Sequence, residues 1–189
     1  MTDPHPISSR AAGSPVATAR AAGAFWAVVF LLGTVSLFIQ PGPLQTAAIR
    51  ASGLCYIVVT LLLYQLLRPV SQPIALVAAL LGLTGCAISL FGLSRVLAVR
   101  DLVFFGGQCV LVGYLIVRST FLPRILGGLL IFGGLGWLTF AVPTLARPLY
   151  PFNYGPGMLG EGALLVWLIV KGVDLPRWLA VAAGDRRSA

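Results

Sequence analysis

One carboxylate in this sequence lies inside a long apolar run, where carboxylates are scarce. Glu161 follows Met158-Leu159-Gly160 and precedes an apolar stretch that continues to Lys171. An ionisable group inside a membrane-length segment is costly to bury, so it is a functional candidate by default. A carboxylate near a helix N-terminus is also favoured by the helix dipole. Glu161 therefore fits a structural role as well.

Four further polar residues are predicted to gather near Glu161 at one end of the fold. Arg95 and Arg100 could supply a counter-charge, Gln108 could supply a hydrogen-bonding group, and Asp101 lies beside them. Two interpretations stay open. The functional one is a binding or proton-handling site built on Glu161. The structural one is an ion pair that locks two helix ends together.

A second polar pair is predicted at the opposite end. Arg118 and Arg124 flank a short turn between two apolar runs. Two arginines in such a turn could hold anionic lipid headgroups. The alternative is that they only fix the topology of the chain.

The other residue types argue against several common chemistries. The only histidine is His5, in the polar N-terminal segment, which removes most zinc sites and histidine-dependent triads. Cys55, Cys86 and Cys109 lie in apolar runs without metal-site spacing, as small buried residues do. We expect no metal and no cofactor. The sequence leans away from an enzyme, because candidates for a second catalytic group are few.

The composition indicates the medium in which the chain folds. Of 189 residues, 58% are hydrophobic and 10% are charged, and the mean hydropathy is +0.96. Soluble domains carry about 25% charged residues, so a bilayer must cover this surface. The net charge is +8, but the basic residues are scattered singly, whereas nucleic-acid binding needs them clustered. We therefore expect no nucleic-acid partner.

Six apolar runs approach or reach the length of a membrane span. They cover residues 21–39, 51–67, 74–93, 102–117, 121–142 and 158–173. The stretch from Ile74 to Val117 must turn, because one helix of that length would be about 66 Å long, roughly twice the hydrocarbon thickness. The runs lack the period-2 alternation of a membrane barrel. The sequence predicts an all-α integral membrane bundle of about six transmembrane helices.

The spans divide the chain into three parts. Residues 1–20 read as a disordered tail, residues 21–175 as the transmembrane domain and residues 176–189 as an interfacial or polar tail. The first run could be a signal peptide, but Gln40-Pro41-Gly42-Pro43 follows it in place of a persuasive cleavage site. With six spans, nine basic residues fall on the side of the termini and four on the other. This bias predicts a multi-pass protein of the cytoplasmic membrane with both termini cytoplasmic.

Small residues recur along the spans at helical spacing. Gly106 and Gly113 lie seven residues apart, as do Gly127 and Gly134, and Ala78 and Gly82 form a small-xxx-small pair. Apolar contact alone gives helices in lipid little reason to associate, so close backbone approach at small residues supplies the packing. These residues predict helix-packing seams, with room for a ligand as the alternative.

Two segments resemble the DUF4386 family of bacterial membrane proteins. Residues 104–137, FFGGQCVLVGYLIVRSTFLPRILGGLLIFGGLGW, resemble its signature, and residues 159–173, LGEGALLVWLIVKGV, resemble its closing Glu-containing helix. Weaker similarities lie at residues 19–26 and 61–79. The resemblance implies a multi-pass helical protein of unknown function. Gln108 stands where members often have histidine, and residues 95–101 form a tighter link than the family's longer segment, which puts a histidine-based role and a roofed pocket in doubt.

Three functions remain open. The first is a non-enzymatic membrane protein that binds a lipid, a small apolar ligand or a partner protein. The second is a small proton-coupled transporter that uses Glu161, although the internal repeat usual in transporters is not evident. The third is a membrane enzyme acting on a lipid or isoprenoid, with Glu161 or Asp101 as the acid. The first leads by elimination.

Overall fold

The computed structural model describes residues 14–36, 38–93 and 100–188, and these residues form helices and no strand. The long helices are α1 (Pro15–Ser36), α2 (Pro43–Leu67), α3 (Gln72–Phe91), α5 (Asp101–Arg118), α6 (Arg124–Leu138) and α8 (Tyr154–Val170). A single 3₁₀ turn, η1 (Thr139–Ala141), and a short helix, α7 (Pro143–Leu149), connect α6 to α8. Helix α9 (Leu175–Ser188) follows α8.

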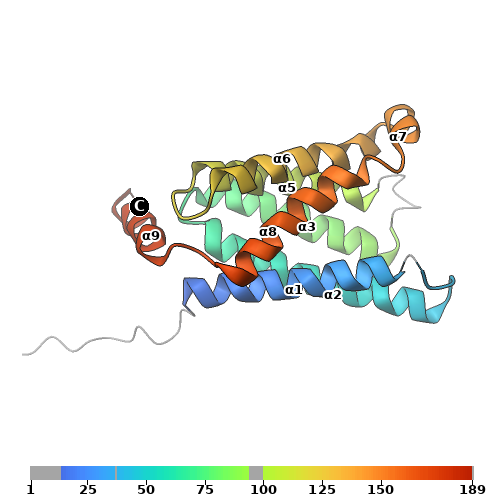
Figure 1. Ribbon diagram of the computed structural model, residues 1–189, viewed down its shortest axis with the longest axis horizontal. Coiled ribbons are helices and arrows are strands. Elements are labelled where there is room, and N and C mark those ends of the chain that lie inside the picture. The colour runs from blue at the N-terminus through green and yellow to red at the C-terminus, as the bar shows by residue number, and fades with distance from the viewer. Residues whose placement is uncertain (1–13, 37, 94–99, 189) are drawn as a thin grey trace, which may run out of the picture.

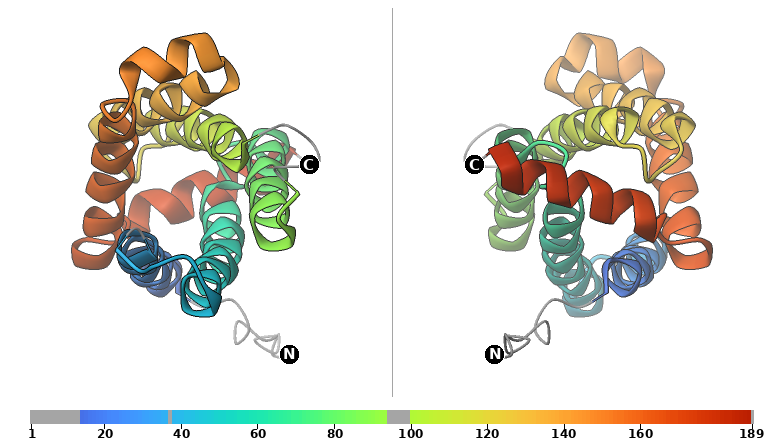
Figure 2. Two further views of the ribbon diagram at one scale, coloured as in Figure 1. Left: turned by 90° about the vertical axis from the view of Figure 1, so that its right-hand side faces the viewer. Right: turned by 90° about the vertical axis from the view of Figure 1, so that its left-hand side faces the viewer.

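The six long helices form a closed ring. Each helix packs against the next in chain order, and α8 packs against both α6 and α1, which closes the ring (Figure 2). Helix α8 crosses the bundle obliquely (Figure 1). In that view α7 lies at one end of the bundle and α9 at the other, and we call these the α7 end and the α9 end. Helix α8 therefore joins the last helices of the ring to the first.

The outer surface of the ring is apolar, as a bilayer requires. Five helices are long and apolar enough to cross a membrane, and α8, with 17 residues, is a shorter apolar helix at the lower limit for a span. Large side chains face outward, with Phe91 76% and Ile125 72% exposed. These features confirm a multi-pass membrane bundle of about six spans.

Helices α1 and α2 begin well before the apolar runs that predicted them. Helix α1 begins at Pro15 rather than Ala21, and α2 begins at Pro43 rather than Ala51. Proline is well suited to the first turn of a helix, because that turn has no partner for its N–H and needs the φ that proline fixes. The apolar run marks only the part of a helix that lies in hydrocarbon, so the polar first turns were not predicted.

The segments outside the apolar runs also differ from the predicted ones. Residues 15–20, predicted to be part of a disordered tail, are helical; residues 1–13 lie outside the described residues. Residues 144–157, which lie between the last two predicted spans, contain most of α7 and the first turn of α8. The C-terminal tail forms α9, which is fixed to the bundle because the Trp178 indole donates a hydrogen bond to the Leu66 carbonyl at 2.9 Å.

Glycines bring α5, α6 and α8 close enough to share a polar centre. Gly106 faces Gly134 and Gly113 faces Gly127 across α5 and α6, so the seams predicted from the seven-residue spacing are confirmed. On the other side of α6, Gly160 of α8 packs against the carbonyl of Leu129. Close backbone approach of this kind lets side chains from three helices reach one point.

Candidate functional site

The Glu161 carboxylate lies at the centre of the ring and is bound by three helices. The Trp137 indole of α6 donates to Oε1 at 2.6 Å, and the Trp26 indole of α1 donates to Oε2 at 3.1 Å. The Cys109 thiol of α5 donates to Oε1 at 3.7 Å. The Glu161 side chain is buried. Burial of a carboxylate is tolerated only with such partners, so this cluster joins α1, α5, α6 and α8.

Aromatic rings cover the cluster on the side of α2. Tyr56 packs edge-on against Trp26, with ring centroids 6.1 Å apart, and against Phe105 at 4.8 Å. Trp26, Tyr56 and Cys109 are all buried. The aromatic shell keeps the polar centre away from the lipid-facing surface. None of the three cavities described below is lined by Glu161.

The predicted partners of Glu161 lie elsewhere. No described basic side chain forms an ion pair with Glu161, so Arg100 is not its counter-charge. Arg95, the other predicted partner, lies outside the described residues. Glu161 is also not in the first turn, because α8 begins at Tyr154, four residues earlier than predicted. The effect of a helix dipole is concentrated in that first turn, so the indoles and the thiol hold the carboxylate instead.

Arg100 and Asp101 lie at the α7 end, where α5 begins. Arg100 is the residue before the first turn of α5, and its guanidinium carbon lies 5.4 Å from the centre of the Phe140 ring. The Asp101 carboxylate accepts a hydrogen bond from the Leu102 amide at 3.0 Å. Arg100 and Asp101 therefore do not contact Glu161, although they were predicted to lie near it. Arg100 belongs to a different site.

That site is a cavity of about 330 Å³ at the α7 end. Its lining residues are Arg100, Phe140, Pro143, Ala146, Arg147 and Tyr150. Both charged side chains of the lining are cationic, and Arg147 belongs to the last turn of α7. The cavity therefore offers two guanidinium groups beside an apolar wall, which suits an anionic group attached to an apolar one.

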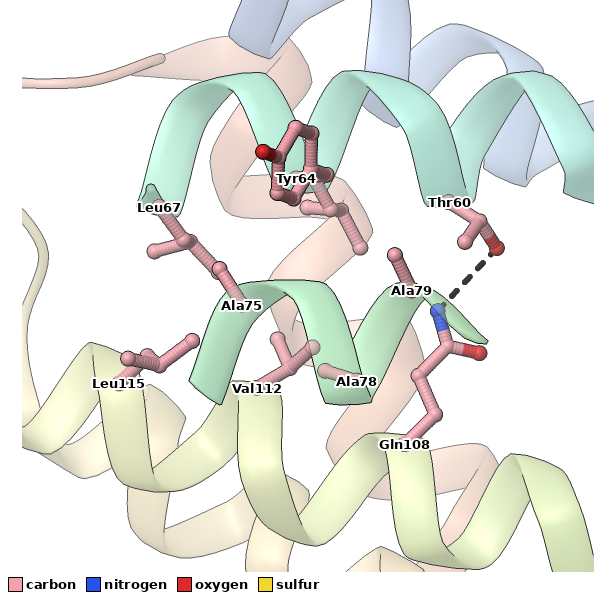
Figure 3. A pocket seen from close by; sticks show the side chains of 10 residues that line it. Thr60, Tyr64, Leu67, Ala75, Ala78, Ala79, Gln108, Val112 and Leu115 are labelled. Atoms are coloured by element: carbon pink, nitrogen blue, oxygen red, sulfur yellow. Dashed lines mark hydrogen bonds between the residues drawn. The ribbon is translucent and has the colours of Figure 1, made fainter. Parts of the chain in front are cut away.

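Gln108 faces away from Glu161, toward α2 and α3. Its Nε2 donates to the Thr60 hydroxyl at 3.1 Å, while its Oε1 is buried without a partner among the described residues (Figure 3). The amide lies against Gly82, where any Cβ would collide with it. Gln108 also borders a narrow cavity of about 10 Å³, roughly the space of one water molecule.

The α9 end holds the second predicted pair. The Arg118 guanidinium donates to the Tyr114 hydroxyl at 3.3 Å and lies 5.9 Å from that ring's centre. Arg124 begins α6 and is exposed. A cavity of about 370 Å³ opens at this end beside Lys171 and Arg177, but neither predicted arginine lines it. Headgroup binding by Arg118 and Arg124 stays a prediction.

Three residues that bind Glu161 were not predicted from the sequence to do so. Trp26 and Trp137 were not among the candidate site residues, and Cys109 was predicted to be a small buried residue. One signal was available, because a buried indole N–H usually needs an acceptor and few acceptors exist in the apolar runs. In the described residues, no group of three or more His, Cys, Asp or Glu side chains is placed to hold a metal ion.

Comparisons with known proteins identify similar sequences. A family described as "Domain of unknown function (DUF4386)" matches residues 43–103 and 101–172. An uncharacterized protein of Archaeoglobus fulgidus is 28% identical over 158 residues, which cover 79% of this chain and 93% of that protein. No solved structure matches the chain. Because this relative is archaeal, the comparison does not support the bacterial origin predicted from the resemblance.

Proposed function

This chain belongs to the DUF4386 family, and we propose that it binds an anionic lipid at the α7 end, with the headgroup between Arg100 and Arg147. The observation that supports it is the cavity of about 330 Å³, in which these two guanidinium groups are the only charged groups among the described lining residues. Two cations in a cavity whose lining, as far as the structure describes it, holds no carboxylate favour an anionic occupant.

The two arginines are suited to a phosphate in different ways. Arg100 is held over the Phe140 ring by a cation–π contact, which orients its planar group before a ligand arrives. Arg147 comes from α7 and is exposed, so it is free to adjust to the ligand. A guanidinium group presents paired donors that match two oxygens of a phosphate.

The surroundings favour a lipid over a free anion. Val142, Leu145 and Leu149 flank the cavity in sequence and are 49%, 47% and 39% exposed. Phe152 follows with 80% of its surface exposed. In a bilayer these side chains contact acyl chains, whereas in water they would be a costly patch. A ligand with an anionic head and an apolar tail matches both halves of the site.

The proposal can be tested by native mass spectrometry of the full chain in detergent. Phosphatidylglycerol is added at increasing concentration, and the bound fraction is compared with that of Arg100→Ala/Arg147→Ala. Each basic residue near a membrane surface contributes about 1 kcal/mol to anionic-lipid binding, so we expect an affinity loss of about 30-fold in the double variant. The control is Arg50→Ala, which removes an exposed arginine of α2 that lines none of the described cavities.

Two further ligands separate the sources of the anion. Phosphatidylcholine has the same chains without the net charge and should bind far more weakly to the wild type. Inorganic phosphate has the charge without the chains and should not compete at millimolar concentration. Equal binding of phosphatidylglycerol to the wild type and the double variant would overturn the proposal. Competition by phosphate would instead assign the site to a soluble anion.

A further inference from the structure

The binding of a lipid at the α7 end makes no use of Glu161, the buried carboxylate at the centre of the ring. Its three hydrogen-bond partners come from three helices and all donate to it. No described cation neutralises it. Removing a carboxylate from water without a cation costs several kcal/mol, so the group gains by taking up a proton whenever one can reach it.

The cluster has an acceptor for that proton. An indole N–H can only donate, so Trp26 and Trp137 cannot accept a hydrogen bond from a protonated carboxyl group. A thiol is both a weak donor and a weak acceptor, and the Cys109 sulfur lies 3.7 Å from Oε1. The thiol can therefore donate to the anion and, after rotation about its Cβ–Sγ bond, accept from the acid.

The other ionisable groups around Glu161 do not compete with it for a proton near pH 7. Helix α2 presents Tyr56 and α5 presents Cys109, and Cys86 of α3 is also buried. Helices α1 and α6 present Trp26 and Trp137, which do not titrate. The ordinary pKa values of tyrosine and cysteine, about 10 and about 8.5, leave these side chains neutral at pH 7.

We propose that Glu161 is a reversible proton-binding site at the centre of the helix ring. One proton from the aqueous phase binds a carboxylate oxygen and forms a neutral carboxyl group. The Cys109 thiol turns from donor to acceptor in the same step. No bond other than these is made or broken. The two indole N–H groups bind the ionised carboxylate of Glu161 more strongly than its neutral acid form. The protonation state of Glu161 therefore changes the strength of its hydrogen bonds to α1 and α6.

The sequence allows this site to be observed directly. Glu161 is the only glutamate of the chain, so glutamate labelled with ¹³C at the side-chain carboxyl gives one signal in the folded protein. We expect this signal, recorded by NMR in lipid nanodiscs, to move between acid and carboxylate positions in one step between pH 4 and pH 9. Glu161→Gln identifies the signal by removing it. A signal that stays at one position over this range would overturn the proposal.

A second measurement distinguishes proton binding from a merely structural role. Trp26→Phe removes a donor that favours the ion and should move the titration midpoint up by about one pH unit, a tenfold change in proton affinity. The matched control is Trp178→Phe, because that indole donates to the Leu66 carbonyl instead and its loss should leave the midpoint unchanged. An unchanged or lowered midpoint in folded Trp26→Phe would contradict the proposal.

Discussion

Gly113 of α5 and Gly127 of α6 lie back to back. A Cβ at Gly113 would stand 2.6 Å from the Gly127 carbonyl oxygen, and a Cβ at Gly127 would stand 2.5 Å from the Gly113 carbonyl oxygen. The pair Gly106 and Gly134, seven residues earlier on α5 and seven later on α6, repeats the relationship with distances of 2.9 and 2.7 Å. The backbones of α5 and α6 therefore touch along two helical turns.

This contact predicts that one methyl group added at Gly113 lowers the stability of the bundle. Gly113→Ala should lower the free energy of unfolding by about 1–3 kcal/mol, the usual cost of overpacking, since a backbone oxygen cannot move aside. Gly128→Ala is the control, because a Cβ there meets open space and alanine favours a helix by up to about 1 kcal/mol over glycine. Unfolding by SDS in mixed micelles measures both variants. Equal stability of the two would contradict the close approach.

The Glu161 cluster predicts an order of stability among substitutions. Glu161→Leu leaves two indole N–H groups without an acceptor and should cost about 1–3 kcal/mol of unfolding free energy. Glu161→Gln keeps one carbonyl oxygen and should cost less. The same SDS titration gives the comparison, with Leu159→Ala, exposed on the same helix, as a control expected to change little. A leucine variant as stable as the wild type would show that the hydrogen bonds contribute nothing.

The contact of Gly82 with the Gln108 amide predicts energetic coupling. A Cβ at position 82 would collide with the amide, so Gly82→Ala should be destabilising by about 1–3 kcal/mol. In Gln108→Ala the obstacle is absent, and the same Gly82→Ala change should cost about 1–2 kcal/mol less. Gly33→Ala, at a position with open space around it, is the reference for a helical glycine without such a contact. Additive effects of the two substitutions would refute the coupling.

The bias of basic residues predicts the orientation of the bundle. We propose that both termini are cytoplasmic, which places the α7 end and its cavity on the outer side. In intact cells a membrane-impermeant maleimide should then label Arg147→Cys, whereas Arg124→Cys should react only after permeabilisation. The unsubstituted chain gives the background from Cys55, which is partly exposed. The reverse labelling pattern would invert the orientation and place the lipid site in the inner leaflet.

The sequence by itself determined the medium, the number of apolar helices and the helix-packing seams. Each of these depends on local properties. A run of about 20 apolar residues needs hydrocarbon whatever its neighbours are. Glycines seven residues apart, as at Gly106 and Gly113, lie on one helix face by geometry alone. Helix ends were predicted less well, because the polar first turns of α1 and α2 carry no apolar signal.

Only the tertiary structure decided which groups meet Glu161. The sequence placed it near Arg100 and Gln108, yet Arg100 lies over Phe140 and Gln108 bonds to Thr60. Adjacent residues 108 and 109 point in directions about 100° apart around α5, and of the two only Cys109 bonds to the carboxylate. The rotation of each helix and the oblique crossing of α8 choose these partners. The rotation and crossing of the helices depend on packing among all six of them, and residue spacing along a single helix does not reveal that packing.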